Sequence, residues 1–133
     1  MVPVNYLAII AATLAAFLFS ALYYFLLNKK IVAIRESYVA KDVDANPGMS
    51  FNKLIIEITR TFVVGLAMSY AVINAQTLVH AAVVVVWLWI AFPVVLLVGS
   101  VIHERYPASL AFIHAIDWLV KLMIIATIIT LWR

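Results

Sequence analysis

The residues whose chemistry stands out are ionisable side chains inside long apolar stretches. His114, Asp117 and Lys121 follow one another at i, i+3 and i+7, a spacing that places all three on one stripe of a helix. Glu57 and Arg60 have a similar relation, i and i+3, in an earlier apolar stretch. Charged groups within a membrane-spanning helix are costly and usually face other helices or a water-filled cavity. These five residues are therefore the predicted intramembrane polar site.

The depth of each group in its helix predicts how these residues pair. At about 1.5 Å of rise per residue, Arg60 and Asp117 each lie on the order of 10 Å into their helices, and Lys121 lies deeper. We therefore expect an ion pair between Arg60 and Asp117 on neighbouring helices. Glu57 is then expected beside His114, and Asp117 also reaches Lys121 along its own helix.

Three interpretations of this polar site remain open, and in the simplest the long side chains only reach the membrane interface and do little else. As a structural clasp, the charges fix only the order and register of the helices, because removing one partner of a buried ion pair strands the other. As a relay, His114 and Lys121 take up and release protons, since the ordinary pKa of histidine lies near neutral pH. The sequence alone does not choose between the clasp and the relay.

Metal binding and covalent catalysis have less support in the sequence. His103 and Glu104 are weak metal-ligand candidates close to the stripe, but the second histidine of the metalloprotease motif is missing four residues after His103. The chain has no cysteine, no Gly-X-Ser-X-Gly elbow and no glycine-rich phosphate loop. We therefore predict no metal, no cofactor and no catalytic residue, and an enzyme is the less favoured class.

Composition decides the broad class of protein. The chain has 133 residues, of which 68% are hydrophobic and 11% are charged. That charged share is about half the share in soluble domains, and a soluble chain of this size leaves much of its surface in water. A soluble enzyme domain, a disordered tail and a nucleic-acid-binding module are therefore poor fits. The composition predicts one membrane domain over residues 1–133. Its expected partners are membrane lipids, and nucleic acid is not expected to bind.

Four stretches are long and apolar enough to cross a bilayer, which takes about 20 residues in a helix. Backbone groups cannot stay unpaired in lipid, so each stretch is expected to be α-helical. The predicted fold is therefore an all-α, polytopic four-transmembrane-helix bundle. Its helices are predicted at residues 4–27, 54–73, 78–102 and 110–132.

The connections between these helices differ in length. The link at residues 74–77 is short and predicts that the second and third helices are antiparallel neighbours. Residues 28–53 form the long loop, whose first half has apolar residues at helical spacing and either extends the first helix or lies along the headgroups. Ser50 is the predicted N-cap of the second helix, and Pro93 is expected to bend the third.

Basic residues gather on one side of the predicted membrane. The opposite side has none before Arg133. The positive-inside rule therefore predicts that both charged connections are cytoplasmic and that both termini lie outside. We expect a multi-pass protein of the inner membrane. The basic residues of the charged side are Lys29, Lys30, Arg35, Lys41, Lys53 and Arg105.

Small residues at four-residue spacing predict where helices approach one another closely. Four helices of this length enclose little more than their own side chains. The small residues are equally available for contacts between chains, so we expect a homo-oligomer. Aromatic residues near helix ends, including Tyr23 and Tyr24, are expected to anchor at the interface. The small residues are Ala8, Ala12, Ala16 and Ser20 in the first span and Gly65 and Ser69 in the second.

Short motifs spread over most of the chain resemble a known family. They are NYLA at residues 5–8, WLWIAF at 87–92, ERYP at 104–107 and DWLV at 117–120. Together they resemble the small bacterial four-helix membrane family known as DUF1761. A common form of that family has an acidic-X-Arg-Pro run, whereas here Tyr106 stands between Arg105 and Pro107. The resemblance implies a four-helix membrane fold and carries over no activity and no catalytic residue.

These observations support two hypotheses about function. The first is a small integral membrane protein that binds or moves a small solute, ion or proton through the polar site between the second and fourth helices. The alternative is a non-catalytic structural, accessory or lipid-interacting protein whose charges only clasp its helices. A polar, water-accessible cavity would favour the first hypothesis, and charges closed off by one another would favour the second.

Overall fold

The computed structural model describes residues 3–38 and 50–132, and within these ranges every regular element is a helix. Lys41 and Arg133, two of the basic residues used to predict the orientation, lie outside the described residues. The elements are α1 (Tyr6–Leu26), α2 (Asn28–Tyr38), α3 (Phe51–Ala71), α4 (Leu78–Trp89), the π-helical turn η1 (Ile90–Val94), α5 (Val95–His103) and α6 (Ala108–Leu131).

The four predicted membrane spans are confirmed. Four helices are long and apolar enough to cross a bilayer, at Tyr6–Leu26, Phe51–Ala71, Leu78–His103 and Ala108–Leu131. The second begins three residues earlier than predicted because Ser50 accepts a hydrogen bond from the backbone N–H of Lys53 and so starts the helix at Phe51.

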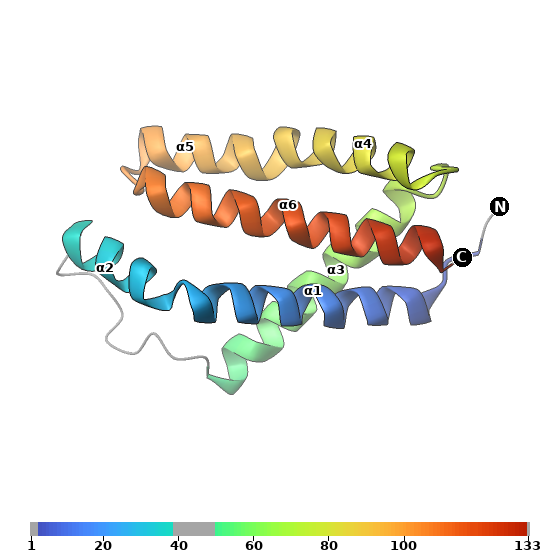
Figure 1. Ribbon diagram of the computed structural model, residues 1–133, viewed down its shortest axis with the longest axis horizontal. Coiled ribbons are helices and arrows are strands. Elements are labelled where there is room, and N and C mark those ends of the chain that lie inside the picture. The colour runs from blue at the N-terminus through green and yellow to red at the C-terminus, as the bar shows by residue number, and fades with distance from the viewer. Residues whose placement is uncertain (1–2, 39–49, 133) are drawn as a thin grey trace.

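The α6 helix lies at the centre of the bundle, with α1 along one side and α4, η1 and α5 along the other (Figure 1). The α3 helix crosses α1 obliquely and packs mainly against α1 and, less extensively, against α6. The expectation that the second and third helices pack as antiparallel neighbours is therefore wrong. The short link joins only their ends, and the crossing angle of α3 separates the rest.

The small residues predicted at helix contacts in the first span are buried within the bundle. Ala8, Ala12 and Ala16 of α1 are fully buried, and they let neighbouring helices approach closely. A Cβ added at Gly65 of α3 would lie 3.1 Å from Ile9 Cγ2 of α1. The apolar core around this contact is formed by Ile9, Ala12, Ala16, Met68, Val72, Ala75, Ala81, Val85, Leu122, Ile125, Ala126 and Ile129.

Pro93 lies within a π-helical turn of the third span, and the bend expected there stays a prediction. A proline has no N–H to donate within a helix, and here a π-helical turn from Ile90 to Val94 surrounds it. Two tryptophans just before the turn point in different directions. Trp87 is 68% exposed, whereas the indole Nε1 of Trp89 donates a hydrogen bond of 2.7 Å to the carbonyl of Ala115 on α6.

Different segments of the chain lie at the two ends of the bundle. Asn5 Nδ2 donates to the carbonyl of Trp132 at 2.9 Å, so the two described chain ends lie at the same end of the molecule (Figure 1). The α2 helix and the α5–α6 connection lie at the other end, which we call the basic end. The α2 helix follows α1 directly and buries Ile31 against Leu110 and Ile113 of α6. That the basic end faces the cytoplasm of an inner membrane stays a prediction.

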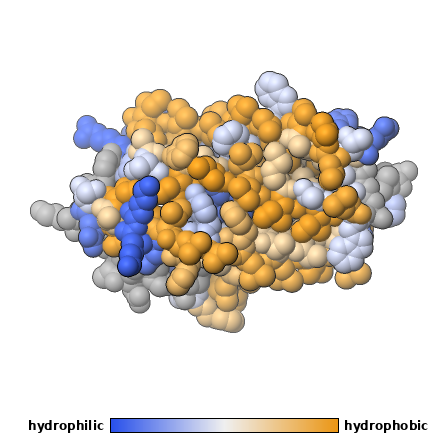
Figure 2. Space-filling model, in the orientation of Figure 1, coloured by the Kyte–Doolittle hydropathy of each residue, from blue (hydrophilic) through white to orange (hydrophobic). Residues whose placement is uncertain are grey.

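Apolar side chains cover the outer surface between these ends. Figure 2 shows hydrophobic residues across the middle of the molecule and hydrophilic ones gathered toward its ends. Large exposed hydrophobic side chains occur on every spanning helix, including Leu18, Val63, Leu96 and Phe112. A surface of this kind is matched to lipid and not to water.

Candidate functional site

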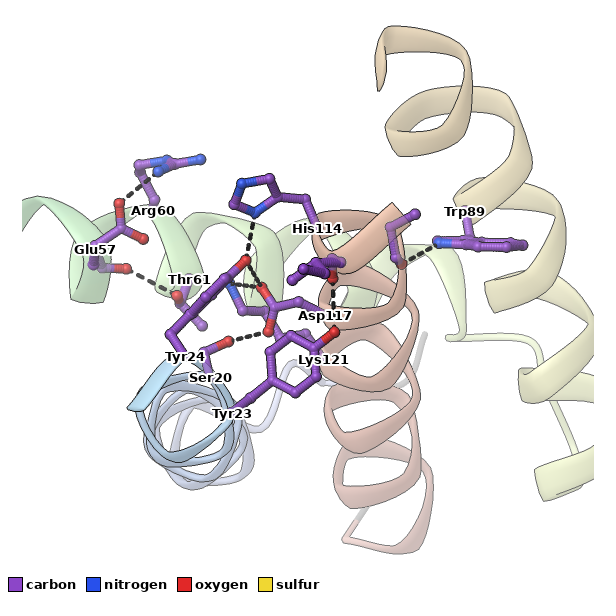
Figure 3. A network of polar contacts seen from close by, with 12 residues as sticks. Ser20, Tyr23, Tyr24, Glu57, Arg60, Thr61, Trp89, His114, Asp117 and Lys121 are labelled. Carbon is purple, nitrogen blue, oxygen red and sulfur yellow. Dashed lines mark hydrogen bonds and ion pairs between the residues drawn. The ribbon is translucent and has the colours of Figure 1, made fainter. Parts of the chain in front are cut away.

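The polar network of this protein is built between the first and last spans (Figure 3). On α6, His114, Asp117 and Lys121 share the face that α1 covers. On α1, Ser20 and Tyr24 are four residues apart and point at that face. Two stripes with helical spacing therefore meet across the most extensive helix contact in the bundle.

Asp117 is the centre of this network and is only 2% exposed. Its Oδ1 accepts a hydrogen bond of 2.5 Å from the hydroxyl of Ser20. Its Oδ2 accepts one of 3.1 Å from the hydroxyl of Tyr24 and lies 3.2 Å from Nζ of Lys121. Both carboxylate oxygens are thus occupied by donors from α1 or by a cation on the same helix.

Tyr24 joins the carboxylate to His114, whose Nδ1 lies 2.6 Å from the Tyr24 hydroxyl. A phenol carries one proton, so it donates to only one acceptor at a time. With Tyr24 donating to Asp117, Nδ1 of His114 is the donor in the other contact, and the histidine carries a proton on that nitrogen. Hydrogen bonds therefore link His114, Tyr24 and Asp117 in one chain, and an ion pair joins Asp117 to Lys121.

The ammonium group of Lys121 is held on two sides. Besides its ion pair with Asp117, its Nζ lies 4.9 Å from the centroid of the Trp118 ring, within the range of a cation–π contact. Lys121 as a whole is 8% exposed. The Lys121 charge is thus compensated within α6 itself, although the carboxylate it faces is fixed by α1.

The predicted pairs between helices are wrong. Arg60 Nη1 lies 2.6 Å from Oε1 of Glu57 on the same helix, and the ion pair of Asp117 is with Lys121. The reason is the orientation of α3, which turns Thr61 inward and leaves Arg60 exposed. Consecutive positions on a helix point about 100° apart, so these two residues face different surroundings. The site therefore lies between α1 and α6, with Glu57 and Arg60 outside it.

Three residues of α1 were missed as members of the network. Ser20 was assigned to helix packing, and Tyr23 and Tyr24 were assigned to the interface. The hydroxyl of Tyr23 in fact donates to the carbonyl of Ile113 at 2.9 Å, and the other two contact Asp117. A signal for them was present, because Ser20 continues the buried alanine ridge and Tyr24 follows it by one further helical turn.

Tyr106 covers the network at the basic end. Its ring centroid lies 6.2 Å from that of His114. It precedes α6 in the connection after α5, where burial raises the pKa of the Tyr106 phenol and the charge of Arg35 opposes that rise. Arg105 beside it has a positive φ of 53°, and the Tyr106 N–H bonds back to the carbonyl of Ser100. The strained turn thus places the ring of Tyr106 beside the ring of His114.

The weak metal candidates do not join this site. His103 ends α5 and Glu104 follows it, and both are exposed. Across residues 3–38 and 50–132, no group of three or more His, Asp or Glu residues is arranged to hold a metal ion. The described geometry therefore offers hydrogen bonding and an ion pair, and it assembles no ligand set.

The fold and the network together define a multi-pass membrane protein with four spans and a buried ion pair. The chain matches the family model described as "Protein of unknown function (DUF1761)" over residues 7–130. It therefore belongs to the DUF1761 family, as its motifs indicated. No curated protein and no solved structure matches it.

Proposed function

We propose that this protein is a non-catalytic structural or accessory component of its membrane, with the Asp117 network clasping its first span to its last. The proposal rests on one observation: the Asp117 carboxylate is buried and already has partners within the chain. Asp117 is 2% exposed and both its oxygens have partners within the chain. A carboxylate engaged in this way offers no open position to a solute.

The remainder of the α1–α6 interface also supports a clasp. Beyond Lys121, toward the end where the termini lie, this interface is formed by apolar side chains that include Ile9, Ala12 and Ile125. Thr13, which is also buried there, donates to the carbonyl of Ile9 in its own helix. A conducting path would need polar groups or water along its length, and these residues supply an apolar seal.

The outer surface fits a component that works through its contacts with lipid or with other proteins. Every span exposes large apolar side chains, and the described structure has its ionisable core residues turned inward between α1 and α6. We therefore assign the lipid-facing helices to contacts with the membrane and its proteins, and the polar network to fixing the helices that carry those contacts.

A second candidate function is the binding of a proton at the same site. It rests on the hydrogen-bonded chain from His114 through Tyr24 to Asp117, whose carboxylate is ion-paired with Lys121. A proton added at His114 can be passed along such a chain by moving each hydrogen between its two partners. The chain starts near the basic end and stops at Asp117, whose carboxylate takes the proton because the ammonium group of Lys121 has no acceptor site, so it describes a site of proton uptake.

A double-mutant cycle tests the clasp against the proton site. Asp117→Asn and Lys121→Met alone each lower thermal stability in detergent, because each strands a buried partner. The double variant is expected to recover much of that loss, because neither charge remains. The protons taken up by the same variants are counted by acid titration in weakly buffered detergent. Uptake by the wild type that both single variants abolish would replace the clasp with the proton site.

A further inference from the structure

The first half of α3 leaves the helix bundle. Figure 1 shows α3 crossing behind α1, with its first turns extending past α1 on the side away from α6. Its buried residues are Thr61, Gly65, Met68 and Ser69, all in the second half. Before Thr61 the helix instead exposes large apolar residues, namely Phe51, Ile55 and Ile56. None of the ten residues from Phe51 to Arg60 is fully buried by the described elements, and only Leu54, Glu57 and Ile58 among them are half-buried.

This uncovered half carries an ion pair. Glu57 and Arg60 lie within the span and pair at 2.6 Å, with side chains 35% and 58% exposed. Ion pairs inside a membrane usually face other helices, because hydrocarbon solvates charge poorly. A pair pointing away from its own bundle is therefore expected to meet protein from elsewhere.

We propose that this surface is the contact between two copies of the same chain. We define the α3 face as Ile56, Glu57, Arg60 and Val63, of which Glu57 is half-buried and the other three are exposed. A two-fold axis along the membrane normal brings α3 of one copy against α3 of the other. Contacts across such an axis are reciprocal, and the axis keeps each residue at its own depth, so Glu57 of each copy reaches Arg60 of the other only across the rise between the two positions.

The geometry of the helix allows both contacts at once. Three residues separate the two charges along the axis, which is a rise of about 4.5 Å, and the side chain of arginine is long enough to span it. Each pair within a copy would become part of a square of two cations and two anions. The apolar residues Ile56 and Val63 would pack on either side of that square and exclude lipid from it.

The charges of the α3 face also favour a second copy of the chain, and not an anionic lipid, as the molecule that binds this face. A phosphate headgroup would be attracted by Arg60 but repelled by Glu57, which is bonded to the same guanidinium. The α3 face is neutral as a unit and carries both signs, so its complement is a surface that also carries both signs. The same face on another copy is such a surface. The inference does not rest on the proposed clasp, since the two sites share no residue.

A charge-exchange experiment tests the α3 face. Arg60→Glu places only acidic groups on the face, and Glu57→Arg places only basic groups on it. Each variant alone is expected to lose dimers by more than about tenfold, because like charges then oppose one another. Co-expression of the two variants is expected to restore a dimer that contains one copy of each, since the opposing faces are again complementary. Native mass spectrometry in mild detergent, with the two copies tagged by different masses, measures both results.

Cross-linking in membranes places the contact on the helix. Because the chain has no cysteine, Val63→Cys introduces a single thiol on the α3 face, and Trp87→Cys introduces one on the exposed surface of α4 as the matched control. Val63→Cys is expected to form disulfide-linked dimers on mild oxidation, and Trp87→Cys is not. A monomeric wild type, a dimer that survives Arg60→Glu, or no restoration on co-expression would overturn the proposal. A dimer that forms only when anionic lipid is added would assign the face to lipid instead.

Discussion

Two ion pairs of nearly the same local design have opposite surroundings in this protein. Asp117 and Lys121 pair at i, i+4 on α6, with side chains 2% and 11% exposed. Glu57 and Arg60 pair at i, i+3 on α3, with side chains 35% and 58% exposed. Helical spacing is enough to form each pair. The helix packed against it then decides what the pair does.

The difference between the pairs lies in what α1 provides. Ser20 and Tyr24 add hydrogen bonds to Asp117, so its charge is compensated from two helices. Glu57 and Arg60 have bonded to each other on a surface that no described helix covers. A buried pair of the first kind ties two spans together, whereas an exposed pair of the second kind leaves its charges available to another molecule.

The largest expected effect comes from removing one charge of each pair. Asp117→Asn should lower the free energy of unfolding by about 3–5 kcal/mol, because Lys121 is left buried without its counter-ion. Glu57→Gln should cost less than about 1 kcal/mol, since exposed pairs contribute little. Denaturant titration in detergent, at a dilution where the protein is monomeric, measures both values. Equal losses in the two variants would show that the pairs do not differ as described.

A smaller effect is expected from removing one hydroxyl. Tyr24→Phe deletes the hydrogen bond to the buried carboxylate and should cost about 1.5–3 kcal/mol, as for other hydrogen bonds to charged groups. Tyr70→Phe is the matched control, because Tyr70 is exposed on α3, and it should change the unfolding free energy very little. If Tyr24→Phe behaves like this control, α1 does not stabilise the Asp117 network through Tyr24.

The smallest effect tests packing within the bundle against packing toward lipid. Gly99→Ala should stabilise the protein by up to about 1 kcal/mol, because alanine favours a helix and nothing lies within 4 Å of the added Cβ. Gly65→Ala should not stabilise the protein, since the added Cβ would lie 3.1 Å from Ile9 Cγ2. Thermal melts of both variants give the sign of each change. Equal stabilisation by both would mean that α1 and α3 are not in close contact at Gly65.

The spans and the buried stripe of α6 were predictable from the sequence. Hydropathy identified four spans because each is a local run of apolar residues. The spacing of Asp117 and Lys121 was enough to place them in reach of each other on one helix. Ser50 was found as an N-cap because its chemistry acts on the next three residues.

The pairing between helices was not predictable in the same way. Residue counting gave Arg60 and Asp117 similar depths, but equal depth does not bring two side chains together. The direction of each residue around its helix and the crossing angle of α3 turned Arg60 outward (Figure 3). The same angles brought Ser20 and Tyr24 to Asp117, across 97 and 93 residues of chain.

The sequence by itself therefore determined the class of this protein, its number of spans, its family and the ion pairs that form within one helix. These properties depend on composition and on residues a few positions apart, and lipid enforces them because it tolerates few unpaired polar groups. The tertiary structure alone decided that α1 completes the Asp117 site and that α3 carries its charges outward. Helix rotation and crossing angle set these contacts through the packing of many small and apolar side chains, and no short segment of the chain encodes that packing.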